Sequence, residues 1–508
     1  MSADPKGTAL RDIIAGVSVA LVLIPQSLAY AELAGLPREL GLFAGAVAPI
    51  AGALFASSPY LQTGPVALTS LLTLGALLPL APEGTPEFVG MAAILALVVG
   101  VSRVLIGTLR AGWISYLMSQ PMMLGFTSAA GVLILSSQLP GALGVAVEAE
   151  GILQRAVWAL AATEQWSVPS IAISAMTLFC IFGLRWVHPR IPGVLFATLI
   201  GIGATLWGGY EGPTLGALAL GFPTIDLLLP WERLPALIIP GFVIALVGFA
   251  ETAAISRTYA ARDRSHWDPD REFIGQGAAN LAAGLFGGFP VGGSFSRSSL
   301  NRLAGARTRL SGAVTGLAVL LFLPAASLLS ALPTAVLSAI VIAAIAGLVD
   351  VRGLARLLGL SGAQAVVGIA TFSLTLMLAP RIDLAVLAGV GLSAVVHMLR
   401  ERRLDIEVED EETVISMWPR GVLWFASAND LERVFLEHVE DSEADHLVIH
   451  MGGLGRVDLS GALVLAQLVG DAEEAGVDVE FVEVPDHARR VLRRVFPKRA
   501  RNDPVKTS

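Results

Sequence analysis

The chain of 508 residues is 54% hydrophobic and only 15% charged, and its mean hydropathy is +0.70. This composition excludes an ordinary soluble enzyme and allows a dozen or more membrane-spanning helices, so it predicts a polytopic α-helical membrane protein. A net charge of −8, without a basic run interleaved with aromatic residues, argues against a nucleic-acid partner.

The first apolar segment covers residues 12–34 and carries two polar side chains, Gln26 and Tyr30. Its end resembles a secretory cleavage site, but Gln26 interrupts the apolar run and apolar sequence resumes after Pro37. We therefore interpret the segment as a retained first span. Gln26 and Tyr30 share one face of a helix, where an amide and a phenol can hydrogen-bond an oxyanion without adding charge. The alternative is a tyrosine at the membrane interface.

Apolar windows long enough to cross a hydrocarbon core of about 30 Å recur along the chain. After residues 12–34 they fall at residues 41–56, 88–109, 113–137, 168–184, 191–209, 234–256, 275–286, 310–332, 335–348, 363–378 and 384–399. Two further stretches, residues 59–78 and 289–303, are interrupted by glycine and proline. Counting each stretch as one crossing predicts fourteen transmembrane segments.

The two interrupted stretches predict helices that begin inside the membrane. In the first, Thr63-Gly64-Pro65 leads into an apolar run, and we place Pro65 at the first helical position, which needs no N–H. In the second, a Gly/Pro-rich stretch precedes Ser294, a good N-cap residue. A half-helix that starts at mid-membrane presents unpaired N–H groups and a partial positive charge, which together favour an anion.

The matching positions of these two stretches predict an inverted repeat. Each stretch follows a span that carries a polar group at mid-membrane, Gln26 in the first half and Glu251 in the second. Seven crossings per half is an odd number, so the second half enters the membrane in the opposite sense. The broken helices then meet N-terminus to N-terminus around one site. The alternative is a pair of kinked, full-length helices with structural glycines.

Two charged residues are candidates for the chemistry of that site. Glu251 lies about halfway through an apolar span, where a charge is expensive unless it is protonated, paired or hydrated. It can take up a proton or a sodium ion together with an anion, or it only accepts hydrogen bonds from the opposing half-helix. Arg297 follows Ser294 and can hold an anion by a charge-assisted hydrogen bond, or it extends toward the basic cluster at residues 302–309.

The charges in the loops predict the orientation. Basic residues fall in alternate loops, among them Arg103 and Arg110, Arg257 and Arg262, Arg302 and Arg307, Arg352 and Arg356, and Arg400 to Arg403. The other loops carry acidic residues, among them Glu83, Glu87, Glu164, Glu211 and Glu232. The positive-inside rule then places both the N-terminus and the C-terminal region in the cytoplasm.

A separate soluble α/β domain is predicted beyond Arg402, because about half of all charged residues lie in this last fifth of the chain. Strands are expected at residues 412–418, 422–426, 446–450 and 477–484, and helices at residues 429–439, 460–475 and 487–496. We therefore divide the chain into a transmembrane domain at residues 1–400, a soluble domain at residues 401–500 and a polar tail at residues 501–508.

Several of these motifs resemble the signature of SulP anion transporters. They are Pro25-Gln26-Ser27-Leu28-Ala29-Tyr30-Ala31, Leu33-Ala34-Gly35-Leu36-Pro37, Gly41-Leu42-Phe43, Gly64-Pro65 and Ser294-Phe295-Ser296-Arg297-Ser298. The resemblance implies a seven-plus-seven inverted repeat like that of uracil permeases, with a core domain and a gate domain. It also implies a homodimer, and substrates such as sulfate, bicarbonate or dicarboxylates.

The resemblance and the half-helix starts together predict a set of substrate-binding residues. They are Gln26, Tyr30, Thr63, Gly64, Val66, Ala67, Gly293, Ser294, Phe295, Ser296 and Arg297. Glu251 matches a position at which bacterial members of the family often hold the coupling cation.

The soluble region resembles a STAS domain, the usual cytoplasmic tail of the family. Asp458-Leu459-Ser460-Gly461 aligns with an Asp-Ser-Ser-Gly loop, so Ser460 matches the serine that soluble relatives phosphorylate. The alternative is that Asp458 and Ser460 only cap the following helix.

Together these features predict a secondary transporter of a small anion in a bacterial inner membrane, working as a proton-coupled symporter by alternating access. Sodium is the alternative coupling ion. Other possibilities are an uncoupled anion channel or exchanger, and a membrane-anchored STAS signalling protein. No nucleophile–base pair, Walker loop or metal-ligand cluster stands out, so we expect no enzyme activity, catalytic residue, metal or cofactor. The residues do not identify which anion is carried.

Overall fold

A computed structural model describes residues 5–116, 118–147, 151–188, 191–218, 221–225, 227–411, 413–439 and 444–496. The chain divides into two compact units, Met1–Gly391 and Leu392–Ser508. Each unit is described by itself below. The polar tail predicted at residues 501–508 lies outside the described residues.

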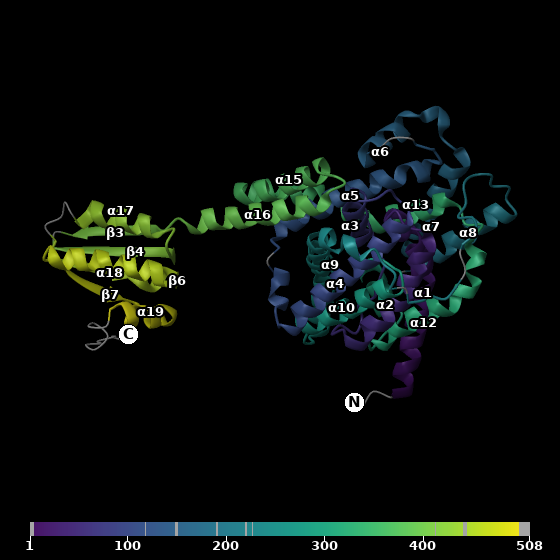
Figure 1. The fold of residues 1–508 in the computed structure, drawn as a ribbon. Coiled ribbons are helices and arrows are strands. Elements are labelled where there is room, and N and C mark those ends of the chain that lie inside the picture. The colour runs from purple at the N-terminus through teal and green to yellow at the C-terminus, as the bar shows by residue number, and fades with distance from the viewer. Residues whose placement is uncertain are drawn as a thin grey trace. The chain divides into compact units, whose positions relative to one another are not determined.

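The first unit is helical (Figure 1). Its first half contains α1 (Pro5–Leu33), α2 (Arg38–Phe55), α3 (Ala67–Leu77), α4 (Pro86–Thr108), α5 (Gln120–Leu143), α6 (Ile152–Ala161), α7 (Val168–Val187) and α8 (Gly193–Leu206). Its second half contains α9 (Leu234–Asp263), α10 (Pro269–Leu285), α11 (Phe295–Leu303), α12 (Leu310–Phe322), α13 (Thr334–Ile345), α14 (Val351–Leu360), α15 (Gly362–Met377) and the start of α16 (Ile382–Glu401). Two short strands, β1 (Thr63–Gly64) and β2 (Gly292–Gly293), precede α3 and α11.

Each of the predicted transmembrane segments overlaps one of these helices. In the described part of the chain, eight helices are long and apolar enough to cross a membrane by themselves. Several of the others, such as α3 and α13, are apolar but shorter. The total of fourteen crossings therefore stays a prediction.

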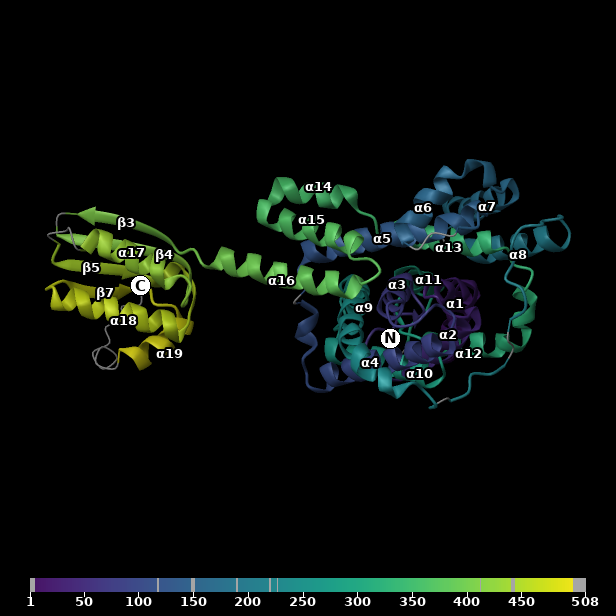
Figure 2. The same ribbon diagram turned by 45° about the horizontal axis from the view of Figure 1, so that its top comes forward.

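The helices of the first unit pack in two groups, which Figure 2 separates clearly. One group, here called the core group, joins α1–α4 to α9–α12, with α10 packed against α2 and α4. The other, here called the gate group, joins α5–α8 to α13–α15, with α5 packed against α13 and α15. Only α1 and α3 make extensive contacts with gate-group helices among the described residues. This arrangement agrees with the core and gate domains implied by the family resemblance.

Small residues let the helices of each group approach closely. A Cβ atom at Gly41 in α2 would overlap the backbone carbonyl of Ser27 in α1. In the gate group, a Cβ atom at Gly125 in α5 would overlap the carbonyl of Gly368 in α15. Because lipid offers no hydrophobic drive for helix association, such close packing contributes much of the stability of a membrane bundle.

The boundaries of the segment predicted at residues 113–137 are wrong. Residues Gly112–Tyr116 form a short 3₁₀ helix, and α5 begins only at Gln120. The hydroxyl of Ser119 caps α5 by accepting a hydrogen bond from the Met122 amide at 3.4 Å. The helix then continues to Gly144, whose left-handed conformation at φ 69° ends it. The capping sequence therefore outweighs the apolar pattern in setting where this helix starts.

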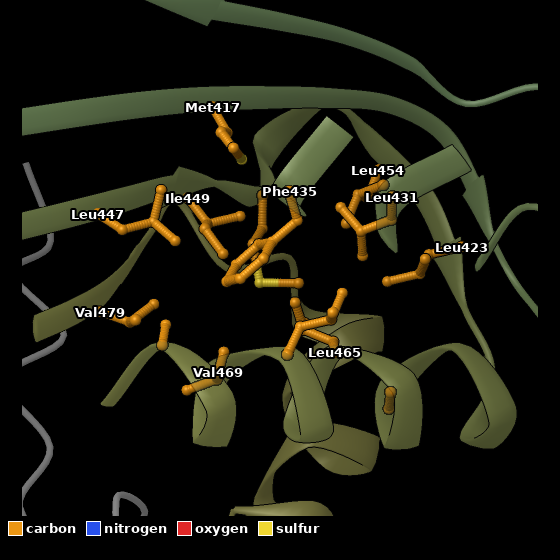
Figure 3. Packing of buried hydrophobic residues seen from close by; sticks show 14 of the residues in the cluster. Met417, Leu423, Leu431, Phe435, Leu447, Ile449, Leu454, Leu465, Val469 and Val479 are labelled. Carbon is orange, nitrogen blue, oxygen red and sulfur yellow. The ribbon is translucent and has the colours of Figure 1, made fainter. Parts of the chain in front are cut away.

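The second unit is a mixed α/β domain. Its strands are β3 (Asp405–Glu411), β4 (Val414–Leu423), β5 (His446–His450), β6 (Leu454–Val457) and β7 (Asp478–Val482), and its helices are α17 (Ala428–Val439), α18 (Leu459–Glu474) and α19 (Asp486–Val495). The main strand order is β3-β4-β5-β7, and β6 pairs with β4. Among the described strands of this unit, only the β3–β4 pair is antiparallel. Figure 3 shows Phe435 at the centre of the core, between strand residues such as Ile449 and α18 residues such as Leu465.

Two details of the predicted strands are wrong. The stretches at residues 412–418 and 422–426 belong to one continuous strand, β4, which ends at Leu423; residue 412 lies outside the described residues. Strands β3 and β6 were not predicted. β3 lies at the edge of the sheet and is largely charged and exposed, and its apolar alternation is limited to Ile406 and Val408, which pack against the core. β6 has only 4 residues.

Candidate anion-binding site

The two interrupted stretches meet inside the core group. β1 pairs antiparallel with β2, so that Thr63 lies opposite Gly293 and Gly64 lies opposite Gly292. The helix α3 starts shortly after β1, and α11 starts shortly after β2. The interruption of both helices is therefore confirmed, and the alternative of two continuous kinked helices is wrong. We call this meeting point the strand crossing.

The predicted start of the first half-helix is wrong by two residues. α3 begins at Ala67, and its N-cap is Val66, whose backbone is extended with φ −142° and ψ 151° and whose side chain makes no cap hydrogen bond. Pro65 therefore lies before the N-cap. Pairing of β1 with β2 holds this part of the chain extended, so helical geometry starts only after Val66.

The predicted start of the second half-helix is confirmed. Ser294 is the N-cap of α11, and its hydroxyl accepts a hydrogen bond from the Arg297 amide at 3.4 Å. The Ser294 amide donates to the carbonyl of Gln62 at 3.0 Å, which fixes the cap against the strand crossing. The next two residues, Phe295 and Ser296, are exposed, and N–H groups in a first helical turn have no partner within the helix.

Arg297 is fully buried, so it does not extend toward the basic cluster at residues 302–309. Its Nη1 donates to Oε1 of Gln26 in α1 at 3.1 Å. Its Nε and Nη2 atoms have no hydrogen-bond partner among the described residues. A Cβ atom at Gly64 would lie 3.4 Å from Nη2, so the unpaired edge lies against β1. A buried, charged donor without a partner is costly, and an anion bound here would satisfy it.

Tyr30 and Glu251 complete the surroundings of Arg297. Tyr30 is buried in α1, one turn after Gln26, and Glu251 is partly exposed in α9. Both side chains lie close enough to Arg297 to interact electrostatically with its charge. No ion pair between Glu251 and Arg297 is found in the described part of the chain. The structure thus brings together four of the predicted polar groups from α1, α9 and α11.

The other predicted residues lie at the strand crossing or directly beside it. Thr63 uses its hydroxyl to accept a hydrogen bond from Nε2 of Gln276 at 2.7 Å, so it supports β1. Val66 and Ala67 are buried, and Gly293 donates its amide to the Thr252 hydroxyl at 3.2 Å. The Phe295 ring is 50% exposed. It lies 6.3 Å from the Tyr259 ring, with the two planes nearly parallel.

Ser460, the predicted regulatory residue, lies in the second compact unit. It is exposed in the first turn of α18. Asp458 is the N-cap of that helix and accepts from the Gly461 amide at 2.7 Å. The capping role proposed for Asp458 is therefore present, and the Ser460 hydroxyl remains accessible.

Three polar residues that support the strand crossing were not predicted. Asn280 in α10 clamps Val291, accepting from its amide at 2.9 Å and donating to its carbonyl at 3.1 Å. Gln276 and Thr252 hold Thr63 and Gly293 as described above. A sequence signal for two of them exists, because Gln276 and Asn280 are four residues apart in an apolar window and so lie on one helical face.

Arg103 was assigned to a loop, and that assignment is wrong. It lies in α4 and is fully buried. Its guanidinium donates to three backbone carbonyls, those of Ala245 at 3.1 Å, Val291 at 3.0 Å and Ile244 at 3.4 Å. Five N–H donors in a planar group can satisfy several carbonyls at once, which explains how an arginine is tolerated at this depth.

Two cavities of about 420 and 540 Å³ open at the far end of α11 from its N-cap. Both are lined by Gly305 and Arg307, and they also include Arg302 and Arg11. Phe295 and Ser296 are exposed at the start of α11, and Leu303, which lines the second cavity, is exposed at its end. α11 is thus exposed at both of its ends, and the second end lies beside Arg302 and Arg307.

Two broken helices that meet N-terminus to N-terminus within an apolar bundle define a class of membrane transport proteins with inverted repeats. Residues 10–371 match the family model described as the sulfate permease family, and residues 405–496 match the STAS domain model. The chain therefore belongs to the sulfate permease family. The predicted resemblance to SulP transporters with a STAS domain is confirmed, and membership in a family of permeases confirms that the chain is not an enzyme.

Curated relatives support this membership. The chain is 36% identical over 327 residues to the probable sulfate transporter MT1781 of Mycobacterium tuberculosis, which covers 63% of this chain and 58% of the relative. It is 27% identical over 507 residues to the putative sulfate transporter YvdB of Bacillus subtilis, covering 95% of this chain and 93% of the relative. The alignments with the first curated relatives span 47% to 58% of their length.

A solved structure supports the fold. The murine Solute Carrier 26 family member A9 anion transporter, in the inward-facing state, superposes with a TM-score of 0.88 at 20% sequence identity. The match covers 97% of this chain and 89% of that chain. The predicted fold class, a polytopic α-helical membrane domain followed by an α/β STAS domain, is therefore confirmed.

Proposed function

We propose that the protein is a secondary transporter of a small anion, which binds at the strand crossing between the N-termini of α3 and α11. The observation that carries this proposal is the buried guanidinium of Arg297, whose Nε and Nη2 have no partner among the described residues. Two half-helix N-termini add positive potential at the same point. Sulfate, bicarbonate and dicarboxylates all fit this chemistry, and sulfate appears in the names of both curated relatives.

Within this proposal the residues of the site have distinct roles. Arg297 binds the anion through its free edge, and the amides of Phe295 and Ser296 donate to it from the start of α11. Gln26 orients the guanidinium from α1 by accepting from its Nη1. The backbone and small side chains of the first half-helix form the opposite wall, with residues Thr63, Gly64, Val66 and Ala67.

Transport by alternating access requires two rigid parts that move against each other around the site. The core group carries every residue of the proposed site, and it meets the gate group mainly through α1 and α3. We propose that the gate group opens the site first to one side of the bilayer and then to the other. We also propose that the protein is a homodimer in a bacterial inner membrane. Residues 1–400 form its transport domain, and both termini lie in the cytoplasm.

Coupling to a proton is proposed at Glu251. This carboxylate is partly exposed, and it lies close enough to Arg297 for the two charges to interact electrostatically. A proton on Glu251 removes a negative charge from the surroundings of the anion, so proton and anion favour each other's binding. Sodium could replace the proton by pairing with the carboxylate instead.

Uptake into proteoliposomes tests this proposal. Radiolabelled sulfate, bicarbonate and succinate are offered with and without an inward proton gradient. We expect the gradient to accelerate uptake of the transported anion in the wild type. In Glu251→Gln the acceleration should disappear, whereas in the control Glu232→Gln, an exposed carboxylate outside the site, it should remain. If uptake by the wild type saturates with anion concentration but does not respond to the proton gradient, the protein is a transporter without proton coupling. Repeating the assay with a sodium gradient then tests sodium as the coupling ion.

Two other outcomes would replace the proposal. Current that rises with voltage without saturating in anion concentration would identify an uncoupled channel. A chain truncated after Arg402 distinguishes a membrane-anchored signalling protein from a transporter. We expect the truncated chain to keep part of its uptake, because every residue of the site lies before that point. Absence of uptake of all three anions by the full chain would contradict the transport function itself.

A further inference from the structure

The charge of the second unit is divided unevenly along its sequence. Residues 405–485 contain 20 acidic residues and only three basic ones, Arg420, Arg433 and Arg456. Residues 486–508 reverse this pattern, with eight basic residues and two acidic ones. Half of these basic residues belong to α19, namely Arg489, Arg490, Arg493 and Arg494. A local reversal of charge in an otherwise acidic domain indicates an anionic partner for that segment.

The arginines of α19 lie on one side of the helix. At about 100° of rotation per residue, their four directions cover an arc of about 140°. The opposite side consists of apolar residues that are buried in the domain core or packed against it, namely Ala488, Val491, Leu492 and Val495. Arg490, Arg493 and Arg494 are exposed. The helix therefore presents a cationic face, and its apolar face is already used by the core of its own domain.

Two of these arginines have charges that the described part of the domain does not compensate. Arg489, at one edge of the arc, donates to the carbonyl of Val484 at 3.2 Å, and its Nη1 lies 3.3 Å from Oδ1 of Asp486. Arg490 and Arg494 are one helical turn apart and form no ion pair with any residue that the structure describes. Their guanidinium groups are therefore available to a further partner.

An anionic bilayer surface suits this face. The helix α16 is a candidate span that ends at Glu401, and β3 of the domain begins at Asp405. So short a tether keeps the effective concentration of a lipid surface high. With the cytoplasmic placement proposed above, that surface carries a negative potential, which attracts arginines near it. The same potential repels the acidic remainder of the domain, so it selects the face formed by α19.

We propose that α19 binds the anionic phospholipid headgroups of the membrane that holds the same chain. The phosphate oxygens of the headgroups accept hydrogen bonds from the exposed guanidinium groups. The contact is electrostatic and does not insert into the bilayer, because the apolar residues of α19 stay in the domain core. This proposal is separate from anion transport, since none of its residues belongs to the strand crossing.

Full-length protein in lipid nanodiscs tests the proposal. His487, an exposed residue of α19, is changed by His487→Cys in a Cys180→Ser background and labelled with a fluorophore. A fixed fraction of the lipids carries a nitroxide on the headgroup, which quenches the fluorophore only at short range. We expect the ratio of quenched to unquenched label to be at least about fivefold higher in an equal mixture of phosphatidylcholine and phosphatidylglycerol than in phosphatidylcholine alone. Salt at about 1 M, where the Debye length is about 3 Å, should remove this difference.

Charge reversal identifies the residues responsible. In the mixture, Arg490→Glu combined with Arg494→Glu should lower the ratio to its level in phosphatidylcholine alone, because each change removes an attraction and adds a repulsion. Arg490→Lys with Arg494→Lys keeps both charges and should keep most of the quenching. The matched control is Arg433→Glu with Arg456→Glu, which alters the net charge equally at two exposed positions in α17 and β6. It should leave the ratio unchanged.

Two results would overturn the proposal. One is quenching that depends neither on phosphatidylglycerol nor on the charge reversal in α19. The other is energy transfer between labels on two chains that the reversal abolishes in both lipids, which would assign the cationic face to the acidic strand β3 of a second copy. Because the reversed positions are exposed, we expect the variants to fold, and an unchanged thermal unfolding transition checks this.

Discussion

The two half-helices occupy matching places in the repeat but differ in composition. α3 has 11 residues, all of them buried, and its N-cap Val66 makes no side-chain hydrogen bond. α11 has 9 residues, is capped by the hydroxyl of Ser294, and exposes a face that begins at Phe295 and Ser296. The third residue is Thr69 in α3 and Arg297 in α11. Both side chains are buried, but only one carries a charge.

This difference indicates how a duplicated scaffold becomes an asymmetric site. Duplication and inversion supply two helix N-termini at one point, and that is a property of the backbone. The side chains then make the two half-helices different. The side chains of α3 are all buried, whereas α11 carries the charged Arg297 and exposes Phe295 and Ser296. The supports differ in the same direction. β2 and its flank are held by Asn280, Thr252 and Arg103, whereas β1 and its flank are held by Gln276 and by Ser298, whose hydroxyl accepts from the Gln62 amide at 2.9 Å.

Replacing Arg297 should produce the largest effect. Arg297→Met removes the buried charge and its unpaired donors, and loss of such a charged contact costs about 2–4 kcal/mol, or about 30- to 1,000-fold in anion affinity. Isothermal titration with sulfate or succinate measures it. The comparison with α3 supplies the control. The Thr69 hydroxyl donates a hydrogen bond to the carbonyl of Val66 at 3.3 Å, so it is already paired within α3. Thr69→Val should therefore change the anion affinity by about threefold or less. Equal losses in both variants would show that the half-helices are not specialised.

Gly64→Ala should weaken binding from the side of β1. Gly64 has φ +155°, a conformation that other residues rarely adopt, and a new Cβ atom would lie 3.3 Å from Cδ1 of Leu23 and 3.4 Å from Nη2 of Arg297. We expect about 1–3 kcal/mol of strain, with weaker anion binding as Arg297 is displaced. The control is Gly84→Ala, where φ is +74° but no atom lies within 4 Å. That variant should lose stability in a thermal unfolding assay and keep its affinity; a loss of affinity there too would contradict the argument.

The broken helices and the cap of α11 could be predicted from the sequence, because glycine, proline and serine inside an apolar run signal a local change of backbone. The start of α3 could not. Val66 is kept extended by pairing between β1 and β2, which lie more than two hundred residues apart in the sequence, and no local pattern reports that contact. Strand β3 was not predicted because only two of its residues, Ile406 and Val408, are apolar, and the others are charged.

The fate of the arginines could not be predicted either. A long cationic side chain near the end of an apolar window either reaches water or finds partners inside, and the sequence alone does not decide between them. Arg297 donates a hydrogen bond to Gln26, which is 271 residues away in the sequence. Arg103 donates hydrogen bonds to carbonyls of α9 and of Val291. A glycine at position 248 that admits the guanidinium of Arg103 is visible only once the helices are packed.

The supports of the two strands should differ in a measurable way. Asn280→Ala removes two hydrogen bonds from Val291 and leaves its buried amide without a partner, while its carbonyl keeps the bond from Arg103, so a loss of about 1–3 kcal/mol is expected. Gln276→Ala removes a single side-chain bond to Thr63, so a loss of about 1 kcal/mol is expected. Thermal unfolding in detergent, with and without sulfate, measures both. A larger loss for Gln276→Ala would reverse the assignment of the better supported strand.

The cap of α11 should give the smallest effect. Ser294→Ala removes the oxygen that accepts from the Arg297 amide, and loss of an N-cap costs about 1 kcal/mol of stability. Ser294→Thr keeps the oxygen and should keep most of that stability. Because α3 functions without a side-chain cap, its N-cap being Val66, an uncapped α11 should still form and still place Arg297 in the site. Anion affinity in Ser294→Ala should therefore fall by only a few-fold. A loss as large as that of Arg297→Met would mean that the Ser294 hydroxyl itself binds the anion, and the charge of Arg297 would then no longer account for the difference between the half-helices.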